Sequence, residues 1–124
     1  MTTFTEPYRA SEIILSESNG TLSREAIVVA SGEGELSAGT VLGLITASGK
    51  YAAYDDGNVD GSETAAAVLL EAIDATSSDI TCSALLRFAE VKKDILQWDA
   101  AVDATAKTAA YAALAGSPTF IIAR

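Results

Sequence analysis

The sequence predicts an α+β fold: a small β-rich single domain of short strands, barrel-like or sandwich-like, with one short C-terminal helix and an extended N-terminal arm. Three observations predict it. Short apolar runs alternate with turn residues through most of the chain, one helical pattern occurs late, and the first eleven residues have no steady period. Because 124 residues are too few for two cores, we divide the chain only into an arm, 1–11, and a domain, 12–124.

The N-terminal segment carries two isolated aromatic groups, Phe4 and Tyr8, in a polar setting. Pro7 and the threonines around it disfavour a packed helix. We therefore expect an arm with no core of its own to join, and a merely frayed terminus is the alternative.

Apolar runs bounded by Gly, Ser and Asn predict the strands, because Ile, Val, Thr and Tyr between turn residues at short spacing are typical of β-structure. The turn at Ser48-Gly49 predicts a hairpin. Residues 65–75 fit a strand or a helix equally well. The predicted strands are 13–15, 26–30, 40–46, 50–54, 65–73 and 80–90.

The helix is predicted where alanines recur at helical spacing up to Leu114. Asp103 or Thr105 can accept the free N–H groups of its first turn. Gly116 is expected to supply a left-handed residue at its end, and Pro118 prevents its continuation. Residues 119–122 then close the chain as a strand.

Composition and charge exclude several classes of partner. The net charge of −9 would repel a phosphate backbone or an anionic membrane, so we expect neither nucleic acid nor membrane as partner. No basic region precedes an apolar run at the N-terminus, and the longest apolar run, 65–70, is too short to span a bilayer. Because alanine is abundant and aromatics make up 6%, large core side chains are few, which favours an oligomer.

No catalytic residues are predicted. The chain has no histidine, which removes the usual general base and the commonest zinc ligand. Cys82 lies in an apolar run and is expected to be a small buried hydrophobe. Residues 43–50 have the wrong glycine spacing for a phosphate loop, and Gly32–Glu35 is interpreted as a turn. An enzyme that uses only carboxylates remains a rival class.

A half-match to a calcium loop begins at Asp56 and reaches its turning glycine at Gly61. The position that needs a bidentate glutamate is Ala67, so we predict no metal site and no cofactor. Asp, Asn and Gly also form tight turns unaided. The alternative function is a β-rich binding module with a weak cation site in the acidic loop 55–63.

From about Gly39 onward, the order of features resembles the bacteriophage lambda head decoration protein D family. The N-terminal third departs from that pattern, because residues 13–15 and 26–30 already look structured. The segments that carry the resemblance are 50–55, an Asp/Gly turn to Asp60-Gly61, 65–70, 86–91, 95–98, the Ala-rich 104–115 and 119–122.

The resemblance implies a non-enzymatic phage capsid decoration protein on the outer surface of the virion, assembled in the bacterial host cytoplasm. It implies a homotrimer that binds the major capsid protein at three-fold and quasi-three-fold sites of the expanded head and stabilises the shell against DNA pressure. The capsid-binding residues would be Phe4, Thr5, Pro7 and Tyr8 of the arm. Leu96 and Trp98 are the largest candidates for the trimer contact, with core packing as their alternative.

Overall fold

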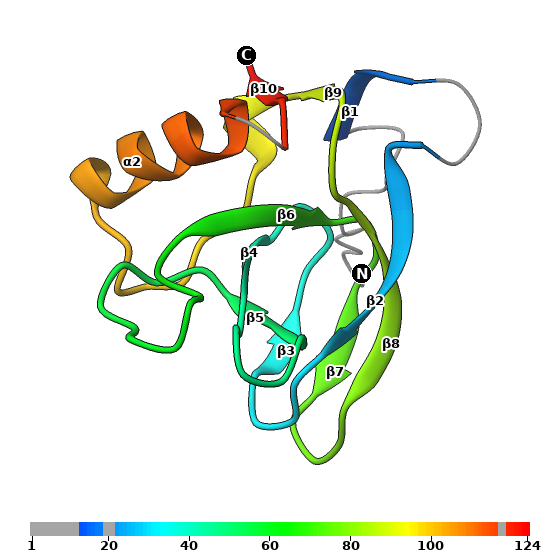
Figure 1. Ribbon diagram of the computed structural model, residues 1–124, viewed down its shortest axis with the longest axis vertical. Helices are drawn as coiled ribbons and strands as arrows, with labels where there is room; N and C mark the ends of the chain where they lie inside the picture. Colours follow the sequence, from blue (N-terminus) through cyan, green and yellow to red (C-terminus); the bar gives the residue numbers. More distant parts are fainter. Residues whose placement is uncertain (1–12, 19–21, 117–118) are drawn as a thin grey trace, which may run out of the picture.

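Five strands form a closed barrel at the centre of the protein (Figure 1). The structure is a computed structural model, and it describes residues 13–18, 22–116 and 119–124. Around the barrel the strand order is β2-β5-β4-β6-β8. The bounds are β2 Arg24–Val29, β4 Val41–Leu44, β5 Tyr51–Ala53, β6 Ala65–Leu69 and β8 Ile80–Leu85.

Small side chains fit the narrow interior of this barrel. Ala67 and Ala84 are fully buried beside Leu42 and Leu69, which form one of the two hydrophobic clusters. A five-stranded barrel encloses little space, so alanines on its inner face fill it where larger residues would collide. The abundance of alanine thus has a reason within one subunit.

The predicted hairpin at Ser48-Gly49 is confirmed. β4 and β5 pair antiparallel, and the backbone N–H of Ile45 donates to the carbonyl of Lys50 at 2.8 Å. Gly49 has a φ of 73°, a left-handed conformation that glycine adopts without strain. The short apolar runs on either side therefore fold as the sequence predicts.

Three sequence predictions need correction around the second half of the barrel. Residues 65–69 form β6, so the helical alternative for 65–75 is wrong. The chain then breaks, and β7 (Ile73–Ala75) pairs with β3 (Gly34–Leu36) in a small separate sheet, so Gly34 and Glu35 are strand and not turn. The predicted strand 80–90 is likewise two strands, because β8 ends at Leu85 and β9 (Ala89–Val91) joins another sheet.

That other sheet holds both ends of the described chain. Its order is β1-β9-β10, with β1 at Ile14–Glu17 and β10 at Ile121–Ala123. β1 is antiparallel to β9, and β10 is parallel to it. The C-terminal strand is thus confirmed, displaced toward the terminus. Figure 1 shows this sheet beside α2, above the barrel.

Helix α2 (Ala104–Ala115) covers the outside of the barrel at β6 (Figure 1). Asp103 is its N-cap, because its side chain accepts the N–H of Ala106 at 2.8 Å, so the Thr105 alternative is wrong. Gly116 has a φ of −80°, so the expected left-handed ending is wrong too. The carbonyl of Gly116 instead accepts the N–H of Phe120 at 3.0 Å, which turns the chain into β10. Pro118 lies outside the described residues.

The second hydrophobic cluster lies where the barrel, the three-stranded sheet and α2 meet. Leu96 is buried in it, and the partly buried Trp98 packs against it between Tyr54 and Tyr111. Both candidates for the trimer contact, Leu96 and Trp98, therefore pack in or against the core of one subunit. A 3₁₀ turn, η1 (Lys93–Ile95), leads from β9 toward them. Among the helices of the described segments, none is long and apolar enough to cross a membrane.

Candidate functional site

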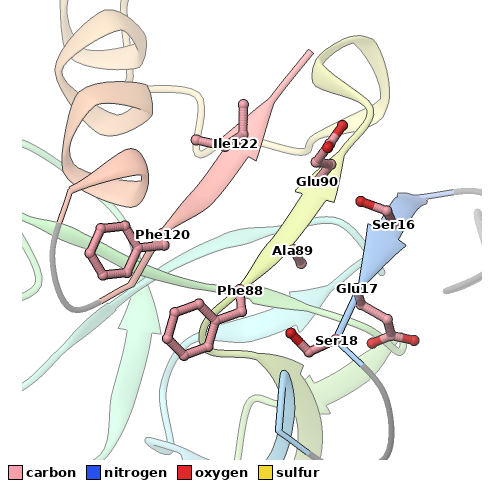
Figure 2. A pocket seen from close by; sticks show the side chains of 8 residues that line it. All are labelled: Ser16, Glu17, Ser18, Phe88, Ala89, Glu90, Phe120 and Ile122. Carbon is pink, nitrogen blue, oxygen red and sulfur yellow. The ribbon is translucent and has the colours of Figure 1, made fainter.

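The three-stranded sheet presents one face to the core and one to the outside. Ser16, Glu90 and Ile122 are register partners across β1, β9 and β10, while Ile121 and Val91 beside them are buried. Because alternate residues of a strand point to opposite faces, the three partners belong to the outward face. We call this surface the outer face. A hollow of about 340 Å³ lies on it, lined by Ser16, Glu17, Ser18, Phe88, Ala89, Glu90, Phe120 and Ile122 (Figure 2).

Two phenylalanines stand side by side at one end of the outer face (Figure 2). The rings of Phe88 and Phe120 stack with centroids 5.7 Å apart and planes 10° from parallel. Their exposed fractions are 41% and 44%, although an aromatic side chain of this size is normally drawn into a core. Together with Ile122 they give the outer face an exposed apolar patch.

Both phenylalanines have a left-handed backbone. The φ of Phe88 is 53° and that of Phe120 is 49°, and no other non-glycine residue of the described chain has a positive φ. This conformation costs a bulky residue roughly 1–2 kcal/mol, because Cβ approaches its own carbonyl oxygen. Two such residues in contact on the surface indicate that the position of the rings matters more than the local stability.

Buried hydrogen bonds hold the strained backbone in place. The hydroxyl of Ser23, which is fully buried, donates to the carbonyl of Phe88 at 2.8 Å and accepts the N–H of Ser18 at 3.0 Å. The N–H of Phe88 donates to the carbonyl of Thr119 at 2.9 Å. The carbonyl of Phe120 accepts the N–H of Ala89 at 3.3 Å. Ser23 just before β2, Ala89 of β9 and Thr119 before β10 therefore hold the backbone of the aromatic pair.

Each carboxylate that lines the hollow is paired with an arginine of the same chain. Arg24 donates to both carboxylate oxygens of Glu17, at 2.8 to 3.2 Å, and this hydrogen bonding raises the pKa of Arg24 further above its ordinary value. Arg124 contacts Glu90 at 2.8 Å. The outer face is consequently close to neutral on a chain whose net charge is −9.

Three carboxylates of the acidic loop 55–63 accept hydrogen bonds from the loop itself. Asp60 accepts the N–H of Ser62 at 3.0 Å and its hydroxyl at 2.5 Å, and these bonds lower the pKa of Asp60 below its ordinary value. The side chains of Asp55 and Glu63 accept the N–H groups of Gly57 and Gly61. Within the described residues, no group of three or more His, Cys, Asp or Glu is arranged to hold a metal ion. The geometry is that of a self-capped turn.

Cys82 is a buried free cysteine in β8, as the sequence predicts. Burial, and to a smaller extent the charge of Glu71, raises the pKa of its thiol. A thiol with a raised pKa is a weak nucleophile, because the thiolate is the reactive form. Cys82 is therefore a packing residue.

The predicted capsid-binding residues, Phe4, Thr5, Pro7 and Tyr8, lie outside the described residues, as does the rest of the predicted arm 1–11. The described chain begins at Ile13, whose side chain is fully buried and whose carbonyl accepts the N–H of Lys92 at 2.8 Å. The N-terminal segment thus joins the body at β1, in the sheet that carries the outer face.

An exposed apolar surface with a polar rim is typical of proteins that bind a partner. Comparison with known families identifies the kind: residues 3–119 match the model of the bacteriophage lambda head decoration protein D. Among curated proteins, no significant match was found.

The chain belongs to the bacteriophage lambda head decoration protein D family. It is therefore a decoration protein of the phage head, located on the capsid surface, and a structural protein and not an enzyme. The match begins at residue 3, so it includes the N-terminal third in which the sequence departs from the family pattern.

Proposed function

We propose that the protein binds as a homotrimer at the three-fold and quasi-three-fold sites of the expanded phage head and reinforces the shell against the pressure of the packaged DNA. The family match over residues 3–119 is the observation that supports this proposal. A trimer on a three-fold site makes three equivalent contacts. Weak individual contacts are then multiplied, because the second and third form at a high effective concentration.

The N-terminal arm is the proposed first contact with the major capsid protein. Its backbone would add a strand to an exposed sheet edge of the shell, with Phe4 and Tyr8 as apolar anchors. Thr5 between them favours extended backbone. Pro7 lacks an N–H and stops the pairing locally, which limits the length of the added strand.

Reinforcement follows from preferential binding to one state of the shell. A ligand that binds only the expanded shell stabilises that state by mass action, in proportion to the logarithm of its free concentration over the dissociation constant. No chemical step and no cofactor is needed for this role.

The test has two parts. Light scattering behind size exclusion should give three times the chain mass at micromolar concentration, and a stable monomer would contradict the proposal. Co-sedimentation should then show saturable binding to expanded shells and little binding to unexpanded shells of the same capsid protein, which serve as the matched control. Equal binding to both shells would remove the stabilising role while leaving decoration intact.

A further inference from the structure

We propose that the outer face is a second shell-binding site, on the folded body, where the stacked rings of Phe88 and Phe120 receive an apolar surface of the major capsid protein. The inference rests on the proposed function and adds a contact to it. In the proposed function, only the arm contacts the major capsid protein.

Phe88 and Phe120 both keep a strained, left-handed backbone on the protein surface. A glycine at either position would adopt the left-handed backbone without strain, yet both residues are phenylalanine, and the carbonyl of Phe88 is held by the buried hydroxyl of Ser23. Strain that persists on a surface is typical of a binding or switch site, where a side chain must be held ready for a partner. Rings fixed before binding lose little conformational freedom on binding, which strengthens the contact.

The charges of the outer face indicate the chemistry of the partner. The Glu17–Arg24 and Glu90–Arg124 pairs leave the outer face without a free charge to match. An unpaired carboxylate there would need a basic partner or would resist desolvation. The complementary surface is therefore apolar, with polar groups at its edge that can meet Ser16 and Ser18.

The aromatic pair lies close to the point where the chain enters the three-stranded sheet. The chain enters β1 where Ile14 pairs with Val91, and the strand ends where Glu17 pairs with Ala89, the neighbour of Phe88. The start of β1, where the described chain enters the sheet, and the aromatic pair thus lie at opposite ends of one short strand, roughly 10 Å apart at 3.3 Å per residue. A shell that holds the segment brings its own surface to the outer face at high effective concentration.

A second copy of this chain fits the outer face less well. Permanent subunit contacts are large and more apolar than transient ones, whereas here three exposed apolar side chains stand among serines and paired carboxylates. A small apolar patch with a polar rim is typical of partners that also exist apart. A decoration protein and its shell are such partners, because the protein is added to a shell that already exists.

The decisive variant is Phe88→Asn with Phe120→Asn. Asparagine tolerates the left-handed region, so the trimer should melt at the same temperature as wild type or higher. Its dissociation constant for expanded shells should rise about tenfold or more, because both aromatic anchors are lost. Val59→Asn is the matched control: Val59 is 96% exposed in the acidic loop, and its substitution should leave binding unchanged.

The possible results distinguish a failure of the body contact from a failure of decoration itself. If wild type binds expanded shells and the double variant binds them equally well, the body contact is wrong and decoration by the arm stands. If the double variant falls apart into monomers, the outer face joins copies of the chain and the inference is overturned. If wild type itself does not bind shells, the proposed function fails first and this contact with it. Should the double variant not fold, Phe120→Gly alone removes one ring and its strain, and the same binding comparison decides.

Discussion

The presence of glycine at position 61 can be explained in two ways, by calcium binding or by packing. In the sequence it occupies the turning position of a half-matched calcium loop, but in the structure its role is packing. Its φ is 111°, and an added Cβ would lie 2.5 Å from the carbonyl oxygen of Leu44 and closer still to the hydroxyl of Thr46. The loop lies tight against the end of β4, since the N–H of Thr46 donates to the carbonyl of Asp60 at 3.0 Å.

We therefore expect Gly61→Ala to lower the free energy of unfolding by roughly 2–4 kcal/mol, from left-handed strain and backbone overlap together. Gly57→Ala in the same loop is the control. Its Cβ would meet only a side-chain oxygen of Asp55, at 3.3 Å, so a change within about 0.5 kcal/mol is expected. Urea unfolding of the two variants gives both values. Equal losses would mean that any alanine in this loop is harmful and that the packing explanation is wrong.

Phe88 marks the limit of sequence reasoning at the residue scale. Cys82 and Ala84 face the barrel interior, and continuing their two-residue period through 80–90 places Phe88 on that same buried side. The chain instead leaves the barrel after Leu85 and turns at a left-handed residue. No local pattern signals this turn, because phenylalanine is the type least expected there. The outer face could not have been found without coordinates.

At the scale of elements, helix α2 offers a clean test of its start. Its alanine-rich surface buries little area, so capping contributes a larger share of its stability than in a helix with large apolar residues. We expect Asp103→Ala to lower the free energy of unfolding by about 1 kcal/mol, because the N–H of Ala106 loses its acceptor.

Thr105→Ala is the control for this prediction. Thr105 is an exposed residue of the first turn, and alanine has the higher helix propensity, so stability should be unchanged or slightly raised. Thermal unfolding followed by circular dichroism measures both variants. A loss at Thr105 as large as that at Asp103 would mean that the helix starts two residues later than the structure has it.

Elements formed by residues that are close in the sequence could be predicted from it. The pairings between strands that are far apart in the sequence could not. The β4–β5 hairpin follows from its turn residues and the helix from its spacing and cap. By contrast, β9 pairs with β1 from the start of the chain and with β10 from its end. Such pairings depend on which strands meet in space, which local propensity does not encode. They are also what builds the outer face.

At the scale of the whole molecule, the sequence predicts the correct protein family, but one of its arguments for an oligomer does not hold. The order of strands and turns in residues 39–124 resembles the family, and the family match confirms it. The shortage of large core residues favours an oligomer, yet the barrel uses its alanines inside one subunit. The proposed trimer therefore rests on the family match and not on a core left incomplete in one chain.

The last prediction separates the body from its N-terminal segment. Deleting residues 1–11 removes few apolar groups and leaves Ile13 in the core, so the trimer should keep its melting temperature. Binding to expanded shells should fall severely, because strand addition and both arm anchors are lost. Phe4→Ala with Tyr8→Ala should weaken binding less, since backbone pairing survives it. Co-sedimentation of all three forms with expanded shells, beside their melting curves, makes the comparison. If the truncated trimer decorates as tightly as the full chain, the arm is only a terminus, and the outer face must account for the whole contact.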